Sequence, residues 1–330
     1  MALASCAGEP TTTLLSGRKL GTSWSVKLAG GDPTPDERGR ALQITEAELD
    51  LVDRLMSTYR QDSELSRLNR HAAAEPFSVS PETLTVLLAS RETGEASGGA
   101  FDVTVGPLVD AWGFGPSGPT QTPAAEDIER LRADSGWDKI KIDASNATVT
   151  KASESVRCDL SGSAKGYAVD RVSQALAQAG WMNHMVEVGG EVRVRGRNAD
   201  GVPWRIGIEK PSVGPRALQR ALPLENQALA TSGDYRNYYE RDGRRYSHTI
   251  DPRNGRPVRH RLASVSVVAA DCLYADARAT ALMALGEDEG YRVAVEQGWA
   301  ALLLVRSEGA ERIEERSTPA FEALFAEGGS

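Results

Sequence analysis

The residues best suited to chemistry form a turn of small and polar side chains, DLSGSAKGY, over residues 159–167. An apolar stretch, 156–160, leads into it and predicts a short strand, and a helical pattern follows. Small residues at a strand-to-helix turn expose backbone amides and carbonyls, and a helix N-terminus favours negative charge. The turn therefore suits a phosphorylated ligand and could lend a carbonyl oxygen to a metal. Tight packing of a helix on a sheet requires the same composition, so the turn alone does not decide.

A carboxylate and a hydroxyl lie four residues apart in the segment 271–285, which has helical periodicity. Asp276 and Thr280 would therefore project from one face of that helix. Mg²⁺ takes hard oxygen ligands, typically one or two carboxylates together with phosphate oxygens and water. The pair fits such a site. The plain alternative for Asp276 is an acid near a helix N-terminus that the helix dipole stabilises.

Two further side chains could assist phosphoryl chemistry. His248 is one of four histidines and precedes the turn 250–252. Histidine titrates near neutral pH, so it could accept the proton of an attacking hydroxyl or hold a phosphate, and it could equally cap the turn. Asp251 would either orient this histidine or form an Asx turn before Pro252. Lys165 lies in the first turn of its helix, where the dipole disfavours a cation unless an anion is bound nearby; the plain alternative is a solvated lysine.

Seven blocks of sequence occur in an order that resembles the ApbE family, the Mg-dependent FAD:protein FMN transferases. The blocks are MSTYRQDSELS (56–66), AFDVTVGP (100–107), DLSGSAKGY (159–167), VEVGGE (186–191), TSGDY (231–235), SHTIDP (247–252) and ADARAT (275–280). The resemblance extends from about Gly21 to Gly286, about four fifths of the chain. Seven ordered blocks are far more specific than any one of them.

The resemblance implies an activity and a set of catalytic groups. FMN would be moved from FAD onto a threonine or serine hydroxyl of an acceptor protein, and AMP would be released. His248 would be catalytic, and Lys165 would be an auxiliary cation that some family members lack. The implied Mg²⁺ ligands are oxygen atoms at four positions, namely Gly162, Asp276, Ala279 and Thr280.

The resemblance also implies which residues contact FAD. They are Leu20, Tyr59, Ala100, Phe101, Asp102, Asp159, Lys165 and Ile250. FAD needs flat surfaces for its two ring systems and donors for its hydroxyls. Phe101 could equally be a core residue, and Asp159 could be an ordinary acid at a helix N-terminus. The family usually has methionine where Leu20 stands, so the shape of the site differs there rather than its chemistry. Trp112 and Phe114 are further candidates for the same cleft.

Two other functions remain open from the sequence. If water replaced the acceptor hydroxyl, the same site would be an FAD pyrophosphatase that yields FMN and AMP. A non-enzymatic flavin-binding protein would instead keep FAD intact, and the Asp276 and Thr280 pair argues against it.

Composition excludes several classes of protein. The chain has 330 residues, of which 40% are hydrophobic and 25% charged, as in ordinary globular proteins. Its net charge of -8 argues against nucleic acid as a main partner, because no basic stripe is present to contact phosphates. Runs of 18 apolar residues, which a spanning helix would need, do not occur. Three irregularly spaced cysteines predict neither a disulfide framework nor a zinc site, and we expect Cys158 and Cys272 to be buried thiols.

The N-terminus carries a pattern of its own. Leu3-Ala4-Ser5-Cys6 matches the lipobox that precedes lipidation of exported bacterial proteins, although a basic region and a full apolar region are missing before it. The alternative is a chance match in a disordered tail. Because the family is usually exported, we expect a location in the bacterial periplasm or cell envelope, with a lipid anchor on Cys6.

Blocks of strands bracketed by helices predict an α+β fold, with an ApbE-like mixed sheet core flanked by helices. Residues 1–16 are expected to be a flexible leader and a candidate lipoprotein N-terminus. Residues 17–330 would form the flavin transferase domain, which could contain two subdomains. The loop 114–123 is either a boundary or a cover over the ligand. The clearest helices begin at Ser80-Pro81 and Thr122-Pro123, follow the 159–167 turn, and occupy 271–285 and 287–297.

Overall fold

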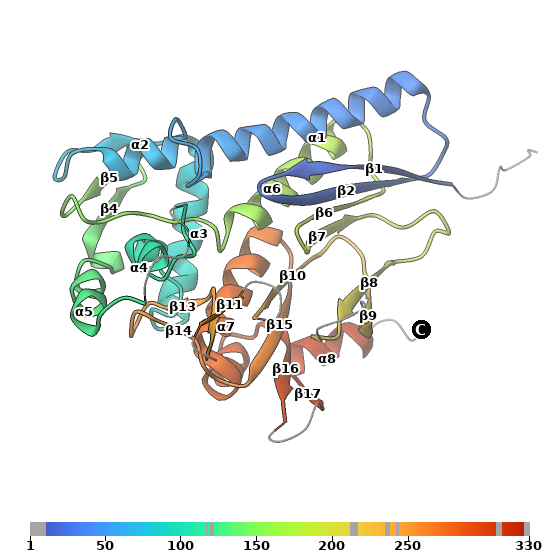
Figure 1. The fold of residues 1–330 in the computed structure, drawn as a ribbon. Helices are drawn as coiled ribbons and strands as arrows, with labels where there is room; N and C mark the ends of the chain where they lie inside the picture. Colours follow the sequence, from blue (N-terminus) through green and yellow to red (C-terminus); the bar gives the residue numbers. More distant parts are fainter. Residues whose placement is uncertain are drawn as a thin grey trace, which may run out of the picture.

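The computed structural model describes residues 11–116, 118, 122–211, 217–234, 238–241, 244–307 and 312–326. Its main element is an eight-stranded sheet with the order β1-β2-β6-β7-β10-β15-β16-β17 (Figure 1). The strands are β1 (Thr12–Lys19), β2 (Thr22–Ala29), β6 (His184–Val188), β7 (Glu191–Arg195), β10 (Ala228–Gly233), β15 (Leu262–Ala269), β16 (Ala300–Arg306) and β17 (Ile313–Ser317).

The α+β class is confirmed, but the sheet is antiparallel throughout rather than mixed. Every neighbouring pair of its strands runs in opposite directions. Short turns join β1 to β2 and β6 to β7, and a hairpin of this kind can only produce antiparallel neighbours.

Helices cover one face of this sheet. They are α1 (Pro35–Met56), α3 (Pro81–Ala96), α6 (Ala164–Gln178) and the long α7 (Cys272–Glu296). Helix α6 packs on β6 and β7, and α7 packs on β10, β15 and β16, with α1 and α3 outside them (Figure 1). The first turn of α1 is fixed by a capping box in which Thr34 and Glu37 exchange hydrogen bonds, and Pro35 occupies the first turn.

The opposite face of the sheet is covered by the hairpin β8 (Trp204–Glu209) and β9 (Leu218–Leu224) and by α8 (Pro319–Ala326). Strand β16 shows how the two faces are divided. Leu303 packs in the core around α7, whereas Leu302 and Leu304 pack with the hairpin and α8. Alternate side chains of a strand point to opposite faces, so both faces of the sheet are buried.

A second region is built mainly from residues 57–160 and lies beside the end of the sheet (Figure 1). It contains a three-stranded sheet of β3 (Phe77–Ser78), β5 (Thr148–Lys151) and β4 (Ile140–Asp143). Its helices are α2 (Glu64–Arg70), η1 (Val103–Val105), α4 (Gly106–Ala111), α5 (Ala125–Ala133) and η2 (Trp137–Lys139). Later in the chain follow β11 (Tyr238–Arg241), β12 (Arg244–Ser247), β13 (Ile250–Asp251) and β14 (Arg256–Pro257), and Ile250 packs with Leu108 and Ile128 of this region.

Several local expectations are confirmed. Ser80 caps α3 through the Thr83 amide, with Pro81 in the first turn. The helices expected over 271–285 and 287–297 form α7, which bends at Gly286, where φ is 82°. Cys158 and Cys272 are buried free thiols. Burial raises the pKa of Cys158 to about 12 and that of Cys272 well above its usual value.

Other expectations need correction. Strand β1 begins at Thr12, inside the segment 1–16 that was expected to be a leader, and Cys6 lies outside the described residues. Residues 156–160 do not form a strand. Helix α5 begins at Ala125 rather than at Thr122-Pro123, and no side chain caps it. Where the structure is described, no helix combines the length and apolar character needed to cross a lipid bilayer.

Candidate active site

A cleft of about 1470 Å³ lies where the sheet, the α6 and α7 helices and the second region meet. Of the predicted catalytic, metal-binding and FAD-contacting residues, all except Ala279 line this cleft. Ala279 lies on α7 but is fully buried in the core against β15 and β16. The role of its backbone carbonyl as a metal ligand therefore stays a prediction. The fold thus gathers residues that are up to 260 positions apart in sequence, from Leu20 to Thr280.

A glycine in α6 allows the two main helices of the site to touch. A Cβ atom on Gly166 would clash with the Cys272 carbonyl oxygen and lie 2.7 Å from the Asp276 Cβ. With no side chain there, the Gly166 amide donates a hydrogen bond of 2.9 Å to Asp276 Oδ2. The turn 159–167 and the acid of α7, both singled out from sequence, are therefore in direct contact.

Three oxygen donors meet at this contact. Asp276 is only 2% exposed, and Thr280 lies one helical turn further along α7. The Thr280 hydroxyl is 3.4 Å from the Gly162 carbonyl oxygen, to which it donates, and 3.4 Å from the Ser232 hydroxyl of β10. The expected grouping of the 276 carboxylate with the 162 turn is present in the fold.

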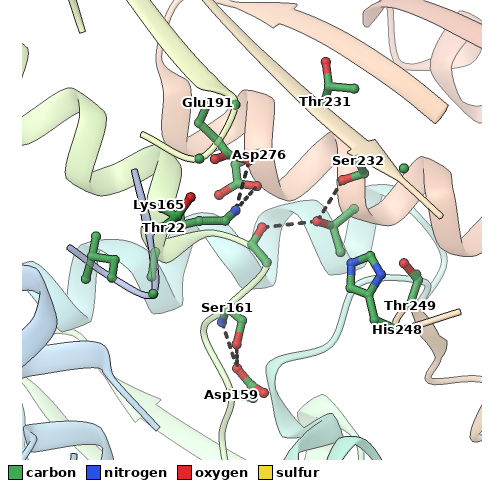
Figure 2. Close-up of a pocket in the computed structure, with 18 of the residues that line it drawn as sticks. Thr22, Asp159, Ser161, Lys165, Glu191, Thr231, Ser232, His248, Thr249 and Asp276 are labelled. Carbon is green, nitrogen blue, oxygen red and sulfur yellow. Dashed lines mark hydrogen bonds and ion pairs between the residues drawn. The ribbon is translucent and has the colours of Figure 1, made fainter. Parts of the chain in front are cut away.

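Lys165 lies between two buried carboxylates (Figure 2). Its Nζ is 3.0 Å from Glu191 Oε1 and 3.6 Å from Asp276 Oδ1. Glu191 is 3% exposed, and its second oxygen, Oε2, has no hydrogen-bond partner among the described residues. Lys165 is therefore paired rather than solvated, and two carboxylates face one ammonium group.

The buried charges shift one another's titration. Burial raises the pKa of Glu191 to about 7, although the Lys165 charge opposes that shift. Burial also raises the pKa of Asp276, again against the attraction of Lys165. For Lys165 burial disfavours the charged form, but Asp276 and Glu191 outweigh it and raise its pKa. The lysine stays protonated at neutral pH, and a second cation would relieve the remaining negative charge.

The donor set fits Mg²⁺ better than a transition metal. Asp276, Thr280 and the Gly162 carbonyl offer oxygen only, and in the described part of the chain no three His, Cys, Asp or Glu side chains converge as a metal site. Zinc sites usually take three or four nitrogen or sulfur ligands, whereas Mg²⁺ is commonly held by few protein oxygens together with substrate phosphates. A pyrophosphate would complete such a site.

His248 lies in the cleft between β12 and β13, on the side of Ser232 (Figure 2). Its ring meets the edge of Phe114 at a centroid distance of 6.5 Å. Asp251 lies three residues after His248 in the sequence. It accepts hydrogen bonds from the Arg253 amide and guanidinium. This arrangement favours the Asx-turn reading of Asp251 over a role in orienting the histidine.

The expected FAD contacts line the rest of the cleft. Leu20 occupies the β1–β2 turn with φ of 54°, a conformation that non-glycine residues seldom adopt. Tyr59 is 71% exposed, so its ring is free for a ligand. Ala100 and Phe101 are 2% and 5% exposed, and Phe101 is at once a core residue and part of the lining. Ile250 of β13 is likewise buried at the cleft wall.

Two of the predicted acids make local hydrogen bonds. Asp102 accepts from the amide and hydroxyl of Thr104, and burial raises its pKa. Asp159 accepts from the amide and hydroxyl of Ser161 at the start of the 159–167 turn. Both therefore fix the backbone of cleft segments.

Sequence reasoning missed some residues of the site and misplaced one. The cleft is also lined by Glu191, Thr22, Thr231 and Ser232. Glu191, Thr231 and Ser232 stand in the ordered blocks, which is the one signal that could have found them, whereas Thr22 stands outside the blocks. Phe114 lines the cleft as expected. Trp112 does not, because it packs on Tyr246 and donates its Nε1 hydrogen to the Gly255 carbonyl.

Known proteins resemble this chain over nearly its whole length. The model of the ApbE family matches residues 20–303. A Vibrio cholerae protein named FAD:protein FMN transferase is 44% identical over 93% of this chain and 91% of its own, and the Escherichia coli K12 protein of the same name is 37% identical over 89% and 84%.

Solved structures agree with this match. The flavin transferase ApbE from Vibrio cholerae superposes with a TM-score of 0.86 at 42% identity, covering 95% of this chain and 99% of its own. The flavinyl transferase ApbE of Pseudomonas stutzeri gives 0.87 at 38% identity, covering 97% and 98%. The chain is therefore a transferase enzyme, and it belongs to the ApbE family.

Proposed function

We propose that this chain transfers FMN from FAD to a threonine or serine hydroxyl of an acceptor protein, with Mg²⁺, and releases AMP. The names of its relatives support flavin transfer to protein. The observation that carries the proposal is the meeting of Asp276, Thr280 and the Gly162 carbonyl with Lys165 in one cleft. These groups suit a pyrophosphate, which is the bond that FAD offers for cleavage.

The cleft has surfaces for the flavin and sites for its phosphates. The exposed ring of Tyr59 and the edge of Phe101 would contact the ring systems of FAD. Asp276, Thr280 and the carbonyls of Gly162 and Ala279 would hold Mg²⁺, which when bound offsets negative charge on the phosphoryl oxygens.

The remaining steps fall to the chain's own residues. The acceptor oxygen attacks the FMN-side phosphorus, the bond from that phosphorus to the AMP phosphate oxygen breaks, and AMP leaves with the electron pair. His248 accepts the proton of the acceptor hydroxyl or steadies a phosphoryl oxygen. Lys165 lies where its charge also faces the pyrophosphate, and it needs no covalent role.

The test is mass spectrometry of an acceptor protein from the same bacterium after incubation with the chain, FAD and Mg²⁺. We expect a covalent gain equal to FMN on a threonine or serine, with AMP release that depends on the acceptor. AMP and FMN produced equally without acceptor would instead identify an FAD pyrophosphatase. FAD that stays intact with Mg²⁺ and acceptor would identify a binding protein.

We also propose that Cys6 carries a lipid anchor that holds the enzyme in the bacterial cell envelope. The support is the lipobox-like sequence around it, which lies outside the described residues. Cell fractionation of the full-length protein would find it with membranes, and Cys6→Ala would release it. Equal distribution of the two proteins would remove this proposal.

A further inference from the structure

The cleft is larger than one ligand requires. Its volume of about 1470 Å³ exceeds the range of roughly 300–1,000 Å³ that is usual for a site holding one small molecule. The predicted FAD and metal residues occupy only part of the lining. A second arm is lined by residues of β2, β6, β7, β8 and β10, namely Lys27, Met185, Glu187, Val192, Arg205, Ile206, Gly207, Glu209 and Leu229.

This second arm lies on the other face of the sheet from the metal ligands. Strand register aligns Glu187 with Val192 and Val192 with Leu229, so these side chains share one face. Val192 and Leu229 pack in the same core as Ile206 of β8. Glu191, adjacent to Val192 in β7, points to the helix face instead, where it meets Lys165.

A gap in the sheet joins the two arms. Ala228 and Leu229 of β10 pair with β7, but residues 231–233 pair only with β15, and no described strand lies on their other side. Thr231 and Ser232 both line the cleft, although neighbouring side chains of a strand point to opposite faces. The cleft therefore reaches from one face of the sheet to the other beside 231–233.

The free edge of β8 borders the second arm. Within the described chain β8 pairs with β9 alone, so its other edge has unpaired backbone groups. Arg205, Ile206 and Gly207 are consecutive and all line the arm, which places the strand's edge rather than one of its faces toward the cleft. Such an edge can take up an extended peptide through main-chain hydrogen bonds.

The charges of the arm favour an acidic segment. Lys27 and the exposed Arg205 have no ion-pair partner among the described residues. The arm also has two acids, and both are engaged. Glu187 accepts hydrogen bonds from the Ser25 hydroxyl and the Gly190 amide, and Glu209 has an interaction partner of its own. A carboxylate on the bound segment would therefore find a free cation in the arm.

We propose that the second arm binds the acceptor polypeptide as an extended, acidic segment along the free edge of β8. This rests on the proposed FMN transfer. In phosphoryl transfer the attacking and leaving oxygens lie roughly in line on opposite sides of the phosphorus. FAD on the helix face and the acceptor on the hairpin face would approach the gap beside 231–233 from opposite sides, which meets that requirement.

The experiment uses a pool of 12-residue peptides, each with one central threonine and with or without an aspartate. The full chain is incubated with the pool, FAD and Mg²⁺, and peptides that gain FMN are identified by mass. We expect peptides containing aspartate to predominate. The best peptide is then made with valine in place of threonine, and hydrogen exchange should slow at residues 204–209 by about tenfold, as expected for amides that gain hydrogen bonds.

Variants test the same contact. Arg205→Glu should raise KM for the best peptide by about tenfold, the loss expected for one charged contact, and leave kcat and the dissociation constant of FAD unchanged. A lysine in place of the peptide's aspartate should restore KM for this variant. Arg312→Glu, at an exposed arginine beside β17, is the matched control and should change nothing.

The outcomes separate the two proposals. Two results would overturn the docking proposal and leave the proposed FMN transfer standing. One is normal transfer without slower hydrogen exchange at residues 204–209, and the other is an unchanged KM for the peptide in Arg205→Glu. If Arg205→Glu raised the KM for the peptide and the dissociation constant of FAD by the same factor, FAD would occupy the arm. That result would also overturn the docking proposal. AMP release with no FMN on any peptide or protein overturns the proposed transfer, and docking falls with it.

Discussion

The carboxylate of Asp276 is almost completely shielded from water. Lys165 is paired with both this carboxylate and that of Glu191. Removing water from a carboxylate is costly unless a cation or several donors compensate. Here the Gly166 amide and Lys165 compensate only in part, and Glu191 Oε2 has no partner in the described structure. Two carboxyl groups beside one ammonium group support the proposal that a divalent cation binds here.

Asp276→Ala should lower the rate of FMN transfer by about a thousandfold, because metal stabilisation of transition-state charge is worth several kcal/mol. FAD binding should weaken far less, since the ring contacts remain. Steady-state AMP release and FAD fluorescence titration measure the two effects. Asp288→Ala removes an exposed acid of the same helix and is the control. Transfer by Asp276→Ala at the parent rate would refute the metal assignment.

At the scale of elements, α7 must keep a fixed position along α6 so that Asp276 reaches the turn at Gly162. Asp170 of α6 provides this link. Its carboxylate accepts hydrogen bonds of 2.9 Å from the Cys272 amide and 2.8 Å from the Leu273 amide, and it pairs with Arg193 of β7. A side chain of one helix thus caps the other helix, which the sequence of α7 alone could not reveal.

Asp170→Ala should lower the free energy of unfolding by about 2 kcal/mol, because it removes a helix cap and leaves buried donors unpaired. Urea unfolding followed by circular dichroism measures the loss. Asp271→Ala is the matched control. Asp271 precedes α7 directly but makes no capping bond, and its ion pair with Arg193 is half-exposed, so we expect a change below about 1 kcal/mol. Equal losses in the two variants would show that Asp170 does not cap α7.

Strand β6 introduces a pH dependence. His184 is fully buried, where its Nδ1 donates to the Trp181 carbonyl and its Nε2 faces the Ser173 hydroxyl at 2.7 Å. Burial, together with the nearby Arg195 and Arg193, lowers its pKa from 6.5 to about 4. The unfolded chain therefore takes up a proton below pH 6.5 that the folded chain refuses until about pH 4.

Stability should accordingly fall as the pH drops from 6.5 to 4, and this histidine alone contributes about 3 kcal/mol to the fall. Urea unfolding at several pH values gives the slope for the parent and for His184→Gln. The variant should be less stable at pH 7 but should lose less on acidification. Parallel slopes for the two proteins would show that His184 is not the group responsible.

At the scale of the whole molecule, the cleft is formed jointly by the sheet, its helices and the second region. A ligand held there contacts all of them and binds only the folded chain. FAD at a hundredfold excess over its dissociation constant should raise the free energy of unfolding by about 2.7 kcal/mol. Thermal unfolding with FAD and Mg²⁺ measures the shift, and AMP at the same concentration is the comparison. No shift at saturating FAD would contradict a site within this cleft.

The sequence predicted this assembly unevenly, and the reasons are physical. Two local signals were reliable, because Ser80 with Pro81 started α3 and Gly286 divided the segment 271–297, whereas Thr122-Pro123 did not start α5. The expected strand 156–160 was wrong because the amide side chain of Asn69 takes the place of a neighbouring strand. Its Nδ2 donates to the Cys158 carbonyl, and its Oδ1 accepts from the Cys158 amide. A bridge between residues 89 positions apart leaves no local pattern.

The ordered blocks predicted most residues of the site, but they did not predict which of these residues contact one another. Glu191 stood in a block that was singled out, but the contact with Lys165 depends on how β7 lies beside α6. The gap beside 231–233 depends on where β7 begins relative to β10. Neither relation is encoded by periodicity along one segment.

The two sealed thiols have a practical consequence. Cys272 lies at the start of α7 against Gly166, and Cys158 is held by Asn69 in the second region, so each reports on a different part of the molecule. A thiol reagent reacts with the thiolate, which burial suppresses at both positions. In a Cys6→Ala background, the rate at which each sulfur is alkylated would therefore time the opening of its own neighbourhood, and a difference between the two would reveal whether the parts come apart together.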